Sequence, residues 1–269
     1  NSIQSKSTPA HELFTEVAQT PASLTSARAA LAAGALKGHR GTVRDATTAY
    51  LQASLKTHKP DGTALPTQWV RLPRSWWPAA WINKDGTSKF YDPVVQLRKA
   101  LYGHPESEAI WDKHLGQRLK SVGWLPVSNQ PGCWHHAATE STLVVYVDDL
   151  LMVAAREHEQ ALWADIEKHI DFSEPAMPID RYLGAHYVME KFKDKHGKEC
   201  MSFSFEMSDF CASACRVFEA DAQKIVGASS LKLHKADTPY AAEHTAGDTD
   251  EPAGVLAGVC ASHLMRLLY

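Results

Sequence analysis

The sequence LVVYVDDLLMV, residues 143–153, is the strongest local pattern of the chain. An apolar, β-branched run over 143–147 ends at Asp148 and Asp149, and a second apolar run resumes over 150–153. Short apolar runs of this composition are typical of buried strands, and a pair of polar residues between them is typical of a tight turn. The stretch therefore predicts two buried strands joined by a two-residue acidic turn, Asp148–Asp149.

The rest of the chain mixes helical and strand patterns around this hairpin. Apolar residues recur at helical spacing in several segments, while alternation and β-branched composition mark further strands. Helices are expected over 23–36, 105–123, 157–170 and 208–226, and strands over 42–45, 68–72, 183–190 and 200–205. Loops are expected at 56–66, at the aromatic stretch 74–81 and at the charged stretch 191–199. These patterns together predict an α+β fold.

The composition is that of an ordinary globular protein. The 269 residues are 44% hydrophobic, and 28 Lys and Arg against 31 Asp and Glu give a net charge of −3. This balance excludes a uniformly basic nucleic-acid binder, although it is compatible with a local basic groove. The apolar runs are too short for a membrane-spanning helix, so no membrane partner is expected. An odd number of cysteines, five, without a secretory signal predicts reduced thiols and an intracellular location.

The chemistry is concentrated in the acidic turn. Asp148 and Asp149 repel each other and resist removal from water, so a compensating group is expected beside them. A hard divalent cation held by oxygen ligands is one such group, and a solvated acidic turn without a ligand is the alternative. Asp45 ends the strand expected over 42–45 and is a candidate third ligand, because a two-metal site needs carboxylates from separate strands. Its alternative role is to cap the turn after that strand.

Several short motifs resemble one family in the order in which that family carries them. The sequence Tyr-Val-Asp-Asp at 146–149 is similar to the YVDD box of reverse transcriptases, and DATTAYL at 45–51 resembles their upstream box. KALYG at 99–103, followed by Ser107 and Trp111, resembles the KALYGLKQSPRAW box of copia-type retrotransposons. YLG at 182–184, the segment 208–218 and DTP at 237–239 resemble elements that follow in that family. The resemblance covers about residues 14–269.

This resemblance implies the fold of a right-hand polymerase palm, in which helices cover one face of an antiparallel sheet. It implies an N-terminal segment 1–20 that is disordered or extended, and a palm with incomplete fingers over 21–205 that carries an insertion at about 56–96. A small helical, thumb-like segment is expected at 206–227, followed at 228–269 by a linker and the start of a connection to an RNase H domain. The expected chain is therefore a piece of a Pol polyprotein.

The resemblance also implies roles for individual residues. Asp45, Asp148 and Asp149 would be the catalytic residues and would hold two Mg²⁺ ions, with Mn²⁺ as an alternative ion. Tyr50 would exclude a 2′-hydroxyl beneath the sugar, and Arg44 would steady a phosphate or the carboxylate of Asp45. The residues implied at the nucleotide are Tyr50, Ala46 and Glu106, and those implied at the primer and template are Tyr146, Val147, Lys99, Tyr102 and Gly103.

The function implied is RNA-directed DNA polymerisation. Its partners would be an RNA template, a DNA primer, deoxynucleoside triphosphates and other Pol segments such as RNase H and integrase, in a cytoplasmic particle or the nucleus. Glu106 stands where the family box has Gln, and a carboxylate there would repel a triphosphate. The alternative is therefore a catalytically inactive palm-fold remnant that acts as a nucleic-acid-binding or scaffold module. A palm-like nucleotidyl transferase of another kind is a third reading.

Two groups of residues leave a structural and a functional interpretation open. Trp76, Trp77 and Trp81 either anchor their loop on the rest of the fold or stack on template bases. The lysines within 191–198 are either a solvated surface or a phosphate contact.

Overall fold

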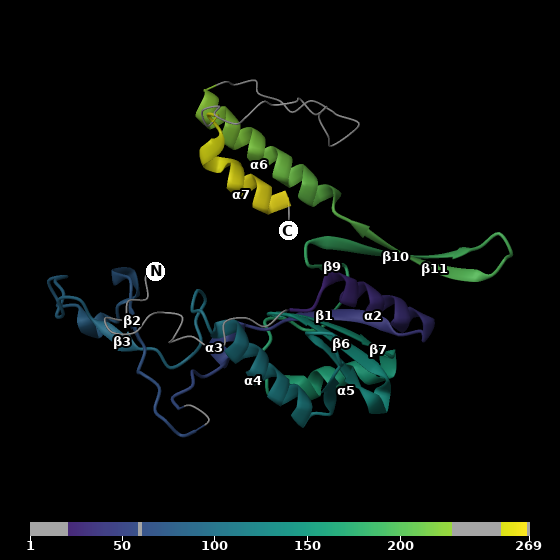
Figure 1. Ribbon diagram of the computed structural model, residues 1–269, viewed down its shortest axis with the longest axis horizontal. Helices are drawn as coiled ribbons and strands as arrows, with labels where there is room; N and C mark the ends of the chain where they lie inside the picture. Colours follow the sequence, from purple (N-terminus) through teal and green to yellow (C-terminus); the bar gives the residue numbers. More distant parts are fainter. Residues whose placement is uncertain (1–20, 59–60, 228–253, 268–269) are drawn as a thin grey trace. The chain divides into compact units, whose positions relative to one another are not determined.

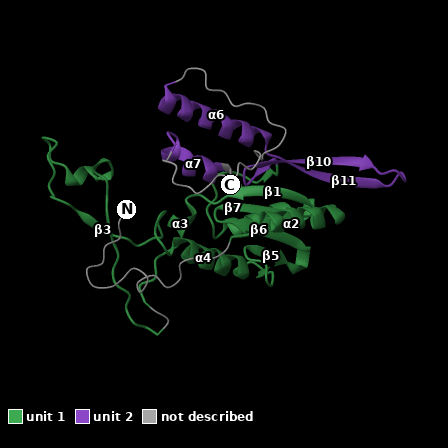
Figure 2. Cartoon of the chain, turned by 45° about the horizontal axis from the view of Figure 1, so that its top comes forward, with its two compact units in different colours: residues 1–179 green, residues 180–269 purple. Residues whose placement is uncertain are grey.

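The computed structural model describes residues 21–58, 61–227 and 254–267. The chain divides into two compact units, residues 1–179 and 180–269, which Figure 2 shows in different colours. The expectations for 1–20, for most of the linker and for DTP at 237–239 lie outside the described residues, and the other domain limits inferred from the sequence remain predictions.

The first unit is built on a six-stranded sheet with the strand order β4-β5-β6-β7-β1-β8. Every neighbouring pair in this sheet is antiparallel. The strands are β1 (Arg40–Asp45), β4 (Trp124–Pro126), β5 (Cys133–His136), β6 (Ser141–Tyr146), β7 (Asp149–Ala154) and β8 (Met177–Pro178). The α+β class is thereby confirmed, and the hairpin predicted over 143–153 is the β6–β7 pair at the centre of the sheet.

One face of the sheet packs against α4 (Ser107–Ser121) and α5 (Arg156–Glu167). The core on this side contains Leu150 and Met152 of β7 together with Trp111 of α4 and Trp163 of α5, all at most 3% exposed. The indole Nε1 of Trp163 also donates a hydrogen bond to Thr42 Oγ1 of β1, at 2.9 Å. Burial of these large side chains is the main stabilising contribution to the unit.

The other face of the sheet is covered by α2 (Leu24–Leu36), which contacts β1, β6 and β7 (Figure 1). The helix lies close because two glycines are at the contact. A Cβ atom on Gly41 would lie 2.8 Å from Leu31 Cδ2, and one on Gly34 would lie 2.2 Å from Val153 Cγ1. Helices therefore cover both faces, and the prediction of helices on one face was wrong. The continuous apolar composition of β7 agrees with burial on both faces.

A long excursion leaves the sheet between α3 (Ala49–Gln52) and α4. Its base is held by backbone pairing, because Ala100 N–H donates to Ala53 O at 2.9 Å and Leu55 N–H donates to Arg98 O at 3.0 Å. It contains the short antiparallel pair β2 (Trp69–Arg71) and β3 (Val94–Gln96), and the 3₁₀ turns η1 (Arg74–Trp76) and η2 (Ala79–Trp81).

Two of the three tryptophans in this excursion pack against aromatic rings of the same loop. Trp77 and Trp81 pack edge to face with ring centroids 5.9 Å apart, and Trp81 packs likewise on Phe90. Trp77 Nε1 donates to Leu72 O at 3.0 Å. Trp77 and Trp81 therefore pack within their own loop, whereas Trp76 is 70% exposed.

In its described residues, 180–227 and 254–267, the second unit contains the sheet β11-β10-β9 and two helices. Its strands are β9 (Arg181–Tyr182), β10 (Ala185–Lys193) and β11 (Glu199–Glu206), and its helices are α6 (Ser208–Val226) and α7 (Ala257–Leu267). The predicted hairpin and the helix over 208–226 are confirmed. Gly227 ends α6 in the left-handed conformation with φ 71°, as expected of a glycine after a helix.

Candidate active site

Two aspartates that are far apart in the sequence are direct neighbours at one end of the sheet. Asp45 is the last residue of β1, Asp149 is the first residue of β7, and the two are paired in the antiparallel register. Directly opposed residues of an antiparallel pair have their side chains on the same face of the sheet. Both carboxylates therefore start from the same face, which is the face of Val43, Gly41 and α2.

Asp148 lies in the turn that joins β6 to β7. Tyr146 pairs with Asp149 across the hairpin, so the two central residues of the turn are Val147 and Asp148. The turn thus lies one residue earlier than the predicted Asp148–Asp149, because Asp149 is held in β7 by its pairing with Asp45. Val147 has φ 57°, a conformation that a β-branched residue rarely adopts.

Hydrogen bonds from three other segments hold this end of the sheet. Ala46 N–H donates to Asp148 O at 2.8 Å, and the indole Nε1 of Trp111 donates to Val147 O at 2.7 Å. Ser173 Oγ donates to Asp45 Oδ2 at 3.2 Å. The backbone of the turn and one carboxylate are therefore placed by contacts with β1, α4 and the loop after α5.

The carboxylates disfavour one another's charge. Burial, and then the charges of Asp148 and Asp45, raise the pKa of Asp149 from 3.8 to about 6. Burial and the charge of Asp148 also raise the pKa of Asp45, against the opposing effect of the Ser173 hydrogen bond. A cation between these groups would relieve the repulsion, since it would favour the charged form of each carboxyl group.

The donor chemistry of the cluster fits a hard divalent ion such as Mg²⁺ or Mn²⁺, which prefers carboxylate oxygens. Within the described residues, however, no three His, Cys, Asp or Glu side chains are arranged so that they could hold one metal ion together. The three aspartates are brought together by the backbone register, which pairs Asp45 with Asp149 and places Asp148 in the adjoining turn.

Two tyrosines lie beside the aspartates. The rings of Tyr50, in α3, and Tyr102, in the loop before α4, have centroids 4.6 Å apart at an angle of 50°. Burial and then the charges of Asp148 and Asp45 raise the pKa of Tyr102. Burial, Glu108, Tyr102 and Asp148 raise the pKa of Tyr50, in that order. Tyr50 and Tyr102 thus adjoin the aspartate cluster, and Glu108 of α4 is a neighbour that the sequence reasoning missed.

Other residues expected at the site have structural contacts of their own. Ala46 is 1% exposed and part of the core, so it reaches the site only through its N–H group. Lys99 Nζ donates to Gln52 O at 3.1 Å. Gly103 has φ 85° with open space around it. Glu106 precedes α4, with its N–H donating to His104 Nδ1 at 3.2 Å, and its charge is not among the causes that shift the pKa of Asp45 or Asp149.

Arg44 does not serve the Asp45 carboxylate. Its side chain lies on the opposite face of β1, where it makes a two-pronged ion pair with Glu167 at 2.9 and 3.1 Å. Its guanidinium lies over the Phe172 ring at 4.1 Å, and its Nε donates to Glu174 O at 2.9 Å. The expectation that Arg44 steadies Asp45 or a phosphate at the site was therefore wrong, because the guanidinium binds Glu167 and Glu174 on the α5 side of the sheet.

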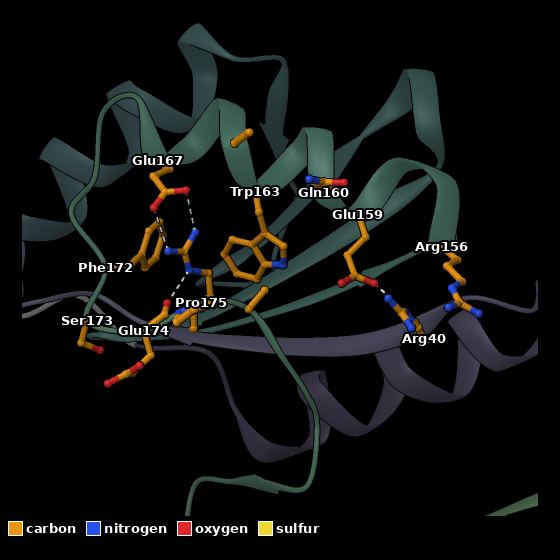
Figure 3. A pocket seen from close by; sticks show the side chains of 13 residues that line it. Arg40, Arg156, Glu159, Gln160, Trp163, Glu167, Phe172, Ser173, Glu174 and Pro175 are labelled. Carbon is orange, nitrogen blue, oxygen red and sulfur yellow. Dashed lines mark hydrogen bonds and ion pairs between the residues drawn. The ribbon is translucent and has the colours of Figure 1, made fainter.

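Figure 3 shows the groove of about 740 Å³ in which this ion pair lies. Its lining contains three arginines and three glutamates: Arg40, Arg44, Arg156, Glu159, Glu167 and Glu174. Arg40 is paired with Glu159, as Arg44 is with Glu167. The charges balance, so this groove lacks the excess positive charge that a polyanion such as nucleic acid would need.

A comparison with models of known protein families finds none that matches this chain. Among the helices that the structure describes, none combines the length and the apolar character needed to cross a membrane.

Proposed function

We propose that this chain is an RNA-directed DNA polymerase segment, a reverse transcriptase palm of copia-type retrotransposon Pol polyproteins. The observation that supports this most is the register that pairs Asp45 with Asp149 and places Asp148 in the adjoining turn. Three carboxylates at one sheet end, from a strand and a neighbouring hairpin, are the donors that nucleotidyl transfer through two metal ions requires.

The proposed roles follow from position. Asp45, Asp148 and Asp149 would hold two Mg²⁺ ions, which when bound activate the primer 3′-hydroxyl and stabilise the charge on the leaving pyrophosphate. Tyr50 and Tyr102 would border the incoming deoxynucleotide, since the two rings contact each other and the charge of Asp148 acts on both hydroxyl groups. Template and primer would approach along the exposed end of the sheet, near Tyr146 and Val147.

Primer extension on an RNA template tests this proposal. Deoxynucleotide incorporation with Mg²⁺ is expected for the unaltered chain, and Asp148→Asn or Asp45→Asn should lower its rate at least about a hundredfold, the usual scale for one electrostatic group in a catalytic site. Asp165→Asn is the matched control, because Asp165 is a partly exposed carboxylate of α5 that pairs with Lys168. Incorporation that survives Asp148→Asn would contradict the proposal.

The second candidate function is a palm-fold remnant that binds nucleic acid without catalysis. It is favoured by one feature of the sequence, Glu106 in place of the glutamine of the family box. This reading predicts binding of an RNA–DNA duplex in a mobility-shift assay, no incorporation under any divalent ion, and the same duplex affinity in Asp148→Asn.

A further inference from the structure

We infer that Trp111 is a positioning residue, which fixes the strained Val147–Asp148 turn and, through it, the Asp148 carboxylate. The indole Nε1 of Trp111 donates to Val147 O at 2.7 Å. The role of the Asp148 carboxylate as a metal ligand rests on the proposed function. The hydrogen bond and the conformation of the turn do not depend on it.

The turn needs an external partner because its own sequence does not favour it. Of its two central residues only the first, Val147, has positive φ, a pattern that in hairpins strongly favours glycine. Valine pays a steric penalty there, and such a conformation persists only where the surroundings enforce it.

Two hydrogen bonds from outside the hairpin hold the turn in this conformation. Trp111 holds the carbonyl of Val147 from α4, and the N–H group of Ala46, just after β1, holds the carbonyl of Asp148 at 2.8 Å. Both carbonyl groups of the turn are thereby satisfied by residues outside the hairpin. Breaking either bond would free the turn to relax toward a conformation that valine prefers, and the Asp148 side chain would move with it.

The indole can act in this way because it is itself fixed. Trp111 is 2% exposed and belongs to the core together with Ile110 and Leu115. Its ring stacks on that of His114 at 5.9 Å and an angle of 22°. A side chain held on all sides can impose its geometry on a turn, as supporting residues do for the ligands of metal sites.

The variant Trp111→Phe tests the inference, because it keeps an aromatic ring and removes the N–H donor. Trp163→Phe is the matched control. Trp163 is 3% exposed in the same core and also loses one indole hydrogen bond, but that bond goes to Thr42 Oγ1 of β1, at 2.9 Å, and not to the turn. Both variants should lower the melting temperature of the full chain.

Two readouts separate positioning from general stability. Hydrogen exchange of the Ala46 amide, which reports the bond to Asp148 O, should become about tenfold faster in Trp111→Phe than in Trp163→Phe. The affinity for Mn²⁺, followed by electron paramagnetic resonance, should fall about tenfold in Trp111→Phe and stay within about twofold in Trp163→Phe. Equal effects of the two variants on Ala46 exchange would overturn the inference.

A change in the turn itself supplies the rescue experiment. Val147→Gly removes the steric penalty, so the turn should keep its conformation without the indole bond. In that background Trp111→Phe should change Ala46 exchange less than about threefold. An undiminished effect of Trp111→Phe would contradict the role assigned to the strain.

Hydrogen exchange in the unaltered chain also tests the inference, and it does not depend on whether a variant folds. In the unaltered chain the Trp111 indole N–H and the Ala46 amide should exchange through the same opening of the turn and show equal protection, and independent exchange would overturn the inference. Failure of the polymerase proposal remains distinguishable. In that case incorporation or Mn²⁺ binding is absent from the unaltered chain, while Ala46 exchange still decides the role of Trp111.

Discussion

Two antiparallel hairpins of this molecule, β6–β7 and β10–β11, make the reversal between their strands in different ways. In β6–β7 most residues are buried, and the strands are joined by Val147–Asp148. In β10–β11 most residues are exposed or half-buried, and the loop follows ordinary turn chemistry. There Asp194 Oδ1 accepts from the N–H groups of His196 and Lys198 at 2.8 and 2.9 Å, and Gly197 supplies the positive φ of 79°.

The two hairpins differ in whether their turn residues suit the backbone conformation of the turn. The exposed hairpin has glycine at its left-handed position and an aspartate that bonds its own loop. The buried hairpin has valine at its left-handed position and adjacent aspartates that repel each other. Departures of this kind persist where something other than folding requires them. The β6–β7 turn is therefore the part of the chain where function is to be sought.

Methionines in the two hairpins give the largest expected contrast. Met152 of β7 is 0% exposed and Met189 of β10 is 47% exposed. Met152→Ala should lower the free energy of unfolding by about 2–5 kcal/mol, because it leaves a cavity in the core. Met189→Ala should change it by about 0.5 kcal/mol or less. Urea denaturation measures both, and similar losses would show that the two hairpins do not differ in burial as described.

The second prediction concerns the acidic end of β7, where Asp149 should make the stability of the chain depend on pH. The pKa of Asp149 is raised to about 6 in the folded chain, so the native state binds this proton more tightly than the unfolded state. Its contribution to stability is therefore present below about pH 4 and is lost as the pH rises through about 6. Asp149→Asn should remove this dependence and stabilise the chain near neutral pH by about 1–2 kcal/mol, a value reduced for partial exposure to solvent.

Denaturation at about pH 4.5 and about pH 7, with a chelator present, measures this effect. Mg²⁺ in place of the chelator should stabilise the unaltered chain at the higher pH and have little effect at the lower, because protons compete with the ion. A stability difference that Asp149→Asn leaves intact would assign the titration to another group.

Exchanging glycine and valine between the two turns comes last, because its effects are no larger than that expected for Asp149→Asn. Val147→Gly should raise the free energy of unfolding by up to about 1 kcal/mol, since glycine adopts positive φ without a steric penalty. Gly197→Val should lower it by about 1–2 kcal/mol for the same reason, and no neighbouring atom adds to this cost because nothing lies within 4 Å of the position. Thermal melts of the two variants should shift in opposite directions, and shifts in the same direction would contradict the assignment of strain.

Much of the secondary structure could be predicted from local sequence patterns. The helix expected over 23–36 exists as Leu24–Leu36, with the Ser23 side chain accepting from Ser26 N–H at its start. The strands β4 and β5 were missed, because WLP and CWHH show no alternation and include a proline. They form through pairing with each other and with β6, which no local pattern encodes.

The candidate site was predictable only in part, for a related reason. Aspartates interrupting or ending apolar strands indicated Asp45, Asp148 and Asp149, but the exact turn depends on the pairing of β1 with β7 and was misplaced by one residue. Glu108 could not be distinguished from the solvated charges of a helix surface. The bond from Trp111 to Val147 O joins residues far apart in the chain, and the apolar spacing of the helix indicated only that Trp111 is buried.

The close contact between α2 and the sheet at Gly41 has a consequence for changes in chain length. Gly41 and Asp45 lie on the same face of β1, and Thr42 and Arg44 lie on the other. Deleting or inserting one residue between Gly41 and Asp45 would keep the strand but turn the aspartate away from its partners or drive a side chain into Leu31. Homologous chains that retain this chemistry should therefore vary the residue types in β1 while conserving the number of residues between the glycine and the aspartate.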